Sequence, residues 1–319
     1  MLEKPRIVFM GTPRFAVPTL EKLIQNGFPV LAVVTAPDKA SGRGLKVREP
    51  EVKIAAVNYN IPVLQPPNLK DEKFAGDLRS LSADLFVVVA FRMLPEKIWS
   101  IPPIGTINLH ASILPYYRGA APINHVIING ERITGVTTFF IEKEIDTGKV
   151  LLQKKTEIGE KETAGELHDR LMTTGADLLI ETVDKISKGS IEPVSQASLV
   201  SAGNIPAAPK ISRNDCRINW MAEAGRVHDF VRGLSPWPGA WTVVVDGERE
   251  IQLKVLMVDK AAAGGLPEPG SIIAIGDEPA VVVSGGAVLL QLVKPEGKRE
   301  MTGAEFLRGF RPGKNAFCK

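Results

Sequence analysis

The sequence contains little cysteine and no long apolar run. Its two cysteines, Cys216 and Cys318, lie far apart, so they supply neither a disulfide framework nor a cluster of metal ligands. No stretch approaches the roughly 18 consecutive apolar residues that a membrane span requires. The opening MLEKPRIVFM also lacks the apolar core and the small-residue cleavage site of a signal peptide. These absences predict a cytoplasmic protein with no metal and no membrane partner.

A strong excess of one charge sign is missing as well. The formal net charge is +3 over 319 residues, with 44% hydrophobic and 24% charged residues, which is ordinary for a soluble globular protein. Net charge by itself therefore does not indicate a nucleic-acid partner. Residues 39–53 and the tail after Glu305 are locally basic, and such clusters are more often solvated surface than phosphate contacts.

A dinucleotide-binding motif is also lacking. Gly11-Thr12-Pro13 follows the first apolar strand, Ile7 to Met10, but it is not the GxGxxG pattern. The second strand ends in Thr35-Ala36-Pro37-Asp38, which gives no convincing carboxylate for a ribose. We therefore do not expect an NAD site.

The pattern of apolar runs divides the chain into three parts. Strand-like and helical runs alternate through residue 188, which predicts a mainly parallel, Rossmann-like α/β sheet with helices on both faces. Residues 189–210 are rich in Ser, Pro, Gly and Ala and are predicted to be a linker. Short β-runs with Gly-rich turns then predict a small barrel. We expect a catalytic domain in residues 1–188 and a second domain in residues 211–319.

The most informative stretch begins with a short apolar strand that contains Ile107, Asn108, Leu109 and His110. Side chains on a strand alternate between faces, so Asn108 and His110 share one face and Leu109 lies behind them. A loop rich in proline and aromatics, SILPYYRG, follows. A hydrogen-bond donor and an imidazole at a strand end, followed by such a loop, are typical of active sites in open α/β sheets.

A carboxylate partner for the imidazole is predicted further along the chain. Asp146 precedes a Thr-Gly turn between two strand-like runs, and that turn could return it toward His110. A carboxylate beside an imidazole favours the charged ring and holds it in place. Asn-x-His on a strand, or Asp-Thr-Gly alone, is more often structural than catalytic. The combination with SILPYYRGAAP favours a catalytic role for Asn108, His110 and Asp146.

These motifs resemble those of folate-dependent formyltransferases. NLHASILPYYRGAAPI, followed by GVTTFFIEKEIDTG, carries the resemblance, and FMGTPRFAVPTL, APDKASGRGLK and VRGLSPWPGAW support it in the right order. The closest similarity is to the branch that formylates methionine on initiator tRNA. The resemblance implies 10-formyltetrahydrofolate as the formyl donor, initiator Met-tRNA as the acceptor, and an OB-like C-terminal barrel that binds tRNA. We also expect a monomer.

The resemblance implies roles for individual residues. Asn108 and His110 would stabilise the oxyanion of a tetrahedral intermediate, and Asp146 would orient His110 and accept a proton through water. At the folate position the chain reads Phe-Arg-Met-Leu instead of Ala-Tyr-Gly, closer to the Phe-Met-Arg of glycinamide ribonucleotide formyltransferases. The residues expected to bind substrate are Phe91, Arg92, Met93, Leu94, Ser112, Leu114, Pro115, Tyr117, Arg118 and Gly119. Those expected to contact tRNA, from a long loop between Ala36 and Pro50, are Lys39, Arg43, Lys46 and Arg48.

Three alternatives remain open at this point. A sugar-nucleotide formyltransferase would share the Asn-His-Asp trio, although the long basic loop and the SPWPGAW barrel argue against it. A formyltetrahydrofolate hydrolase would use water as the acceptor, and the trio does not exclude it. A non-enzymatic nucleic-acid-binding protein would explain the barrel and the loop but leaves the trio without a role.

Overall fold

The computed structural model describes residues 4–41, 46–200, 204–262, 267–311, 313 and 315–319. Its contacts divide the chain into two compact units. The sheet unit comprises residues 1–119, 134–156 and 168–207, and the barrel unit comprises residues 120–133, 157–167 and 208–319. The expected domain limits at residues 188 and 211 stay a prediction.

A seven-stranded sheet forms the centre of the sheet unit, in the order β10-β9-β7-β6-β1-β2-β5. The five strands from β7 to β5 are parallel to their neighbours, whereas β9 runs antiparallel to β7. Their near-continuous Val, Ile and Leu content suits strands that are covered on both faces. The mainly parallel α/β fold is therefore confirmed. The strands are β1 (Ile7–Gly11), β2 (Val30–Val34), β5 (Val63–Leu64), β6 (Leu85–Val89), β7 (Gly105–His110), β9 (Ile133–Phe140) and β10 (Val150–Glu157).

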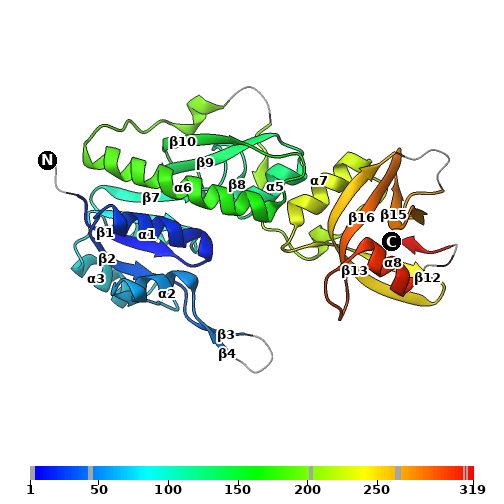
Figure 1. Cartoon of the computed structure of the whole chain (residues 1–319). Coiled ribbons are helices and arrows are strands. Elements are labelled where there is room, and N and C mark those ends of the chain that lie inside the picture. Colours follow the sequence, from blue (N-terminus) through cyan, green and yellow to red (C-terminus); the bar gives the residue numbers. More distant parts are fainter. Residues whose placement is uncertain (1–3, 42–45, 201–203, 263–266, 312, 314) are drawn as a thin grey trace. The chain divides into compact units, whose positions relative to one another are not determined.

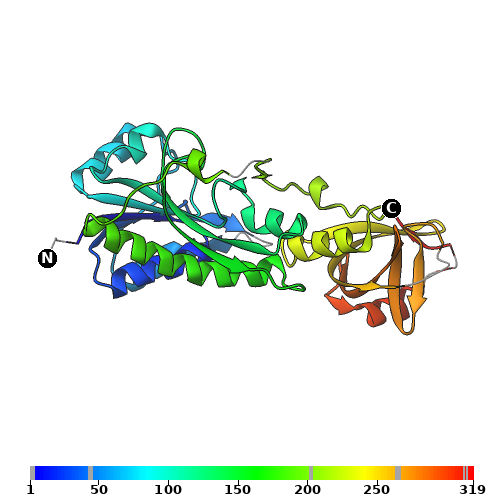
Figure 2. The same ribbon diagram turned by 90° about the horizontal axis from the view of Figure 1, so that it is seen from above.

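Helices cover both faces of this sheet (Figures 1 and 2). Phe74 and Leu78 of α3 and Ile98 of α4 pack on the face that carries Val8 and Val88. On the other face, the backbone of α6 at Gly175 lies so close to Leu109 that an added Cβ would fall 2.7 Å from it. The helices beside this sheet are α1 (Val17–Gln25), α2 (Glu51–Asn58), α3 (Glu72–Ser80), α4 (Glu96–Trp99) and α6 (Ala164–Ser187). The unit also contains 3-10 turns at Arg14–Ala16 and Gln196–Leu199.

The long connection after β2 contains a short hairpin where the sequence predicted a loop. Strands β3 (Lys39–Ser41) and β4 (Lys46–Arg48) pair antiparallel, with Lys39 opposite Arg48. Arg43 lies outside the described residues. Two further short strands, β8 (Arg118–Gly119) and β11 (Ala207–Ala208), form a separate two-stranded sheet.

The barrel unit contains an antiparallel sheet in the order β14-β15-β16-β13-β12-β18, with β17 beside β16. Its two ends meet, because the Cys318 amide donates to the Gly270 carbonyl at 2.7 Å and Ser271 bridges Phe317. This closure confirms the small OB-like barrel. The strands are β12 (Ala240–Asp246), β13 (Arg249–Ala261), β14 (Ile272–Ile275), β15 (Glu278–Val283), β16 (Gly286–Pro295), β17 (Met301–Thr302) and β18 (Phe317–Cys318).

Helices of the barrel unit pack on its apolar core. The helix α7 (Ala224–Leu234) buries Val227, Val231 and Leu234 in this core, and α5 (Pro122–Ile128) contacts α7. The helix α8 (Gly303–Phe310) opens with a capping box in which Thr302 and Glu305 exchange hydrogen bonds, and it packs against β15 and β16 (Figure 1). A 3-10 turn spans Asn214–Cys216. Among the described residues, no helix combines the length and apolar character that crossing a bilayer requires.

Candidate active site

Strand β7 ends at His110, at the carboxyl edge of the parallel strands. Asn108 and His110 share one face of β7, and Leu109 points to the opposite face, where α6 covers it. The Asn108 side chain is half-buried, and no hydrogen-bond partner of its amide is found among the described residues. His110 is 7% exposed. The strand therefore positions one unpaired amide and one nearly buried imidazole beside each other.

Buried polar groups hold the loop after β7 in place. The Ser112 hydroxyl donates to the Tyr116 carbonyl at 2.7 Å, and the Thr137 hydroxyl on β9 donates to the Ser112 carbonyl at 2.7 Å. The Leu114 amide donates to the same Thr137 hydroxyl at 3.1 Å, and the Gln153 amide on β10 donates to the Leu114 carbonyl at 2.8 Å. These hydrogen bonds hold the loop against the sheet and so fix where the residues after the loop lie.

Asp146 sits in the tight connection between β9 and β10. Its φ of 55° lies in the left-handed region, which a non-glycine residue adopts only when its surroundings hold it there. The connection approaches itself so closely at Gly148 that an added Cβ would fall 1.7 Å from the Phe140 carbonyl oxygen. The connection is therefore built for close backbone contact, and it turns Asp146 toward β7.

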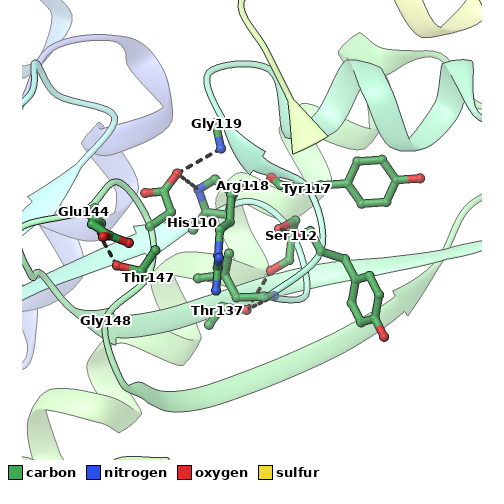
Figure 3. A network of polar contacts seen from close by, with 12 residues as sticks. His110, Ser112, Tyr117, Arg118, Gly119, Thr137, Glu144, Thr147 and Gly148 are labelled. Carbon is green, nitrogen blue, oxygen red and sulfur yellow. Dashed lines mark hydrogen bonds and ion pairs between the residues drawn. The ribbon is translucent and has the colours of Figure 1, made fainter. Parts of the chain in front are cut away.

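The structure brings His110 and Asp146 together. The Nδ1 atom of His110 lies 3.8 Å from Oδ2 of Asp146, and its Nε2 donates to the Tyr117 carbonyl at 2.9 Å (Figure 3). The same Oδ2 accepts a hydrogen bond from the Gly119 amide at 2.9 Å. The bond to Tyr117 fixes the orientation of the ring, and the bond to Gly119 fixes the carboxylate. At 3.8 Å, Nδ1 is beyond hydrogen-bond distance of Asp146, and no other hydrogen-bond partner of Nδ1 is found among the described residues.

Arg92, one of the residues expected to bind folate, ties two loops together. Its guanidinium donates to the Pro66 carbonyl at 2.9 Å and lies 5.3 Å from the centre of the Phe91 ring. Burial lowers the pKa of Arg92 from its ordinary value. Leu94 is buried in the core, whereas Met93 is 75% exposed. Contact with a ligand through this segment stays a prediction.

Most of the other predicted substrate residues are buried in the loop after β7. Ser112, Leu114, Pro115 and Tyr117 are buried, and their side chains shape the loop. Gly119 is half-buried and contacts Asp146. Their binding role stays a prediction.

Of the predicted tRNA contacts, Lys39 and Arg48 are exposed. Arg48 forms an ion pair with Glu51 at 2.8 Å. Lys46 begins β4, and Arg43 lies outside the described residues. Their role toward tRNA stays a prediction as well.

Three polar residues that hold the site, one threonine and two glutamines, were not predicted from the sequence. Thr137 and Gln153 support the loop after β7, and Gln196 contacts both Arg118 and the Asp146 backbone. Gln196 lies in the segment predicted to be a linker, yet it is 3% exposed. A polar residue among small residues gives no local signal of burial. Within the described part of the chain, no group of three or more His, Cys, Asp or Glu side chains could hold a metal ion.

The family models match both halves of the chain. Residues 5–183 match the model described as "Formyl transferase", and residues 210–311 match "Formyl transferase, C-terminal domain". The fold and the site thus define a formyl transferase. Curated relatives narrow the class, and several of them are methionyl-tRNA formyltransferases. The chain is 45% identical to that of Bacteroides thetaiotaomicron over 311 residues, covering 97% of each chain, and 43% identical to that of Flavobacterium johnsoniae, again covering 97% of each. The chain belongs to the methionyl-tRNA formyltransferase family.

Solved structures with the same fold are more distant in sequence. HypX from Aquifex aeolicus in complex with tetrahydrofolic acid is 18% identical, with a TM-score of 0.65 over 98% of this chain and 48% of that chain. This chain therefore spans about half of HypX. The sugar 3N-formyl transferase WlaRD is 17% identical, with a TM-score of 0.62 over 93% of this chain and 100% of that chain. At these identities the likeness supports the fold alone.

Proposed function

We propose that this chain transfers the formyl group of 10-formyltetrahydrofolate to the α-amino group of methionine on initiator tRNA, and that Asn108, His110 and Asp146 carry the chemistry. Membership of the methionyl-tRNA formyltransferase family supports the reaction. The observation that carries the residue roles is the approach of His110 Nδ1 to Asp146 Oδ2 at 3.8 Å, with Asn108 on the same face of β7 as His110.

The neutral amine attacks the formyl carbon and forms a C–N bond, and the carbonyl oxygen becomes an oxyanion. The Asn108 amide and the Nδ1–H of His110 are the donors that stabilise this oxygen, and they act most strongly where water is excluded. Donation from Nδ1 as well as from Nε2 requires both ring nitrogens to carry a hydrogen, and the Asp146 carboxylate lies 3.8 Å from Nδ1. Because Nε2 is already bonded to Tyr117, the ring presents Nδ1 to the substrate.

The intermediate collapses when the bond between the formyl carbon and N10 of the folate breaks. The attacking amine loses one proton, which passes through water to the Oδ1 atom of Asp146 and is then delivered to N10 as N10 leaves. The Gly119 amide occupies Oδ2, so Oδ1 is the oxygen that remains for this transfer. No covalent intermediate with the enzyme is needed.

The test compares three acceptors under one set of conditions: initiator Met-tRNA, a sugar-nucleotide amine, and water alone. We expect the highest kcat/KM with initiator Met-tRNA, with little release of formate when no acceptor is present. Preference for the amino sugar would indicate a sugar-nucleotide formyltransferase. Formate release at the same rate with and without tRNA would indicate a formyltetrahydrofolate hydrolase.

Recognition of tRNA is assigned to the basic segment between β2 and α2 and to the barrel unit. We expect Arg43→Ala to weaken formylation of Met-tRNA, because an acceptor stem near the site would meet the charge of this segment. Loss of a phosphate contact would reduce the salt dependence of binding by about one counterion, whereas loss of a base contact would cost roughly 1–3 kcal/mol of discrimination. Measuring kcat/KM with initiator and elongator Met-tRNA at several salt concentrations distinguishes a phosphate contact from a base contact. Equal kcat/KM in wild type and Arg43→Ala for both tRNAs would refute this role.

The proposal also includes a monomer that works in the cytoplasm. The two cysteines of the chain, both free and buried in the barrel unit, support a reducing compartment.

A further inference from the structure

Gln196 forms four hydrogen bonds that link the two loops of the active site. Its Oε1 accepts from Nε of Arg118 at 3.0 Å and from the terminal nitrogen of the same guanidinium at 2.6 Å. Its Nε2 donates to the carbonyls of Asp146 at 2.9 Å and of Gly148 at 2.8 Å. Gln196 is 3% exposed, so these bonds form away from water, where they are stronger.

The chemistry of the partners fixes the orientation of this amide. A guanidinium only donates hydrogen bonds and a backbone carbonyl only accepts them, so Oε1 must face Arg118 and Nε2 must face the two carbonyls. Glutamine is therefore matched to this position, because it offers an acceptor at one corner and two donor hydrogens at the other. A carboxylate of the same shape would keep the contact with Arg118 but would present an acceptor to two acceptors.

The bonds of Gln196 act on the residue that faces the catalytic histidine. Asp146 has a φ of 55°, an unfavourable backbone conformation, and its carbonyl is held by Gln196. On the other side of the turn, the Gly119 amide holds the Asp146 carboxylate, and Arg118 precedes Gly119 in the chain. A closed ring of contacts thus runs from Asp146 through Gly119 and Arg118 to Gln196 and back to Asp146.

We propose that Gln196 is a positioning residue for formyl transfer: it holds the turn of Asp146 and the end of the loop after β7 in register, so that the carboxylate stays beside His110. This inference rests on the proposed roles of His110 and Asp146. It also gives Arg118 a structural task, the anchoring of Gln196. The substrate contact expected of Arg118 stays a prediction.

The test measures steady-state kinetics with initiator Met-tRNA for Gln196→Ala and for Gln196→Glu. Displacement of a catalytic group by about 1 Å can cost roughly 10²-fold in rate, so we expect kcat to fall by roughly 10–100-fold in both variants. KM for the folate should remain within about threefold, because the positioned carboxylate acts in the transition state and not in ground-state binding. Ser198→Ala is the matched control, since it removes an exposed hydrogen bond to Ser195 in the same 3-10 turn. It should keep the wild-type kcat.

A double-mutant cycle separates positioning from general damage. If Gln196 acts through Asp146, then Gln196→Ala should cost less than about twofold in an Asp146→Asn background, because coupled residues are not additive. Thermal melting of each variant verifies that it is folded. If Gln196→Ala unfolds, Gln196→Glu, which retains the contact with Arg118, provides the test. The inference is overturned by an unchanged kcat, by an effect on KM alone, by an equal loss in both backgrounds, or by the same loss in Ser198→Ala. Failure of the wild type to formylate Met-tRNA would instead overturn the proposed function.

Discussion

The sheet unit and the barrel unit bury polar side chains for different purposes. In the sheet unit, Ser112, Thr137 and Gln196 are buried beneath two loops, and each is hydrogen-bonded to their backbone. In the barrel unit the core is mainly apolar, and a buried pair such as Trp220 and Thr242 joins elements within that core. Satisfied buried hydrogen bonds specify a geometry, while apolar burial supplies most of the stability. Disturbance of the sheet unit near the loops should therefore reduce activity, and comparable disturbance of the barrel should reduce stability.

Two readouts distinguish the units. Formyl transfer reports on the sheet unit, which contains Asn108, His110 and Asp146. Both cysteines lie in the barrel unit, where burial raises the pKa of the Cys318 thiol to about 12 and also raises the pKa of the Cys216 thiol. At pH 8 the folded protein should therefore react slowly with a thiol reagent, since the thiolate is the reactive form. Faster labelling reports opening of the barrel.

The largest contrast is expected from an asparagine substitution in each unit. Asn108→Ala should lower kcat by roughly 10²–10³, because it removes a donor to the oxyanion, with little change in folate affinity. Asn124→Ala is the matched control in the barrel unit, where the Asn124 amide donates to the Gly233 carbonyl at 2.8 Å. It should lower the melting temperature and leave kcat unchanged. A kcat for Asn108→Ala within a few-fold of wild type would remove Asn108 from the mechanism.

The next contrast uses two glycines with the same steric constraint. A Cβ at Gly148 would lie 1.7 Å from the Phe140 carbonyl oxygen, and a Cβ at Gly303 would lie 1.7 Å from the Leu290 carbonyl oxygen. Overpacking of this kind costs roughly 1–3 kcal/mol or more. Gly148→Ala should reduce kcat by displacing Asp146, with slow thiol labelling retained, whereas Gly303→Ala should accelerate labelling with kcat retained. If Gly148→Ala accelerated thiol labelling and Gly303→Ala lowered kcat, the proposed difference between the two units would be refuted.

The smallest contrast concerns helix caps. Asp71 caps α3 by accepting from the Lys73 amide at 3.0 Å, and Thr302 caps α8 by accepting from the Glu305 amide at 3.2 Å. Replacement of either by alanine should cost about 1 kcal/mol of unfolding free energy. Only Thr302→Ala should accelerate thiol labelling, and neither should change kcat. A large kcat loss in either variant would mean that these helix caps also position the trio.

The sequence predicted those parts of the site that follow from local patterns. Alternation along a strand paired Asn108 with His110, and turn chemistry placed Asp146 near a reversal of the chain. The supporting residues could not be predicted in this way, because Thr137, Gln153 and Gln196 reach the site from separate segments whose pairing depends on the tertiary fold. Burial of Gln196 is a property of that fold and not of its neighbours in the sequence.

The fold class was predictable from the alternation of strands and helices, whereas some local elements were not. The basic tail was interpreted as surface, although Thr302-x-x-Glu305 carries a capping signal for a helix, the same signal that Thr163-x-x-Glu166 carries at the start of α6. The long connection after β2 forms a hairpin, because backbone pairing between Lys39 and Arg48 needs no hydrophobic alternation in so short a strand.

The central claim is that Asp146 acts on formyl transfer through its position beside His110. The most direct test is the single-turnover rate of formylation of initiator Met-tRNA by Asp146→Asn, a substitution that preserves the shape of the side chain but removes its charge. The account predicts a fall of roughly 10²–10⁴ in this rate, with folate affinity and melting temperature unchanged. A single-turnover rate within a few-fold of wild type would contradict it.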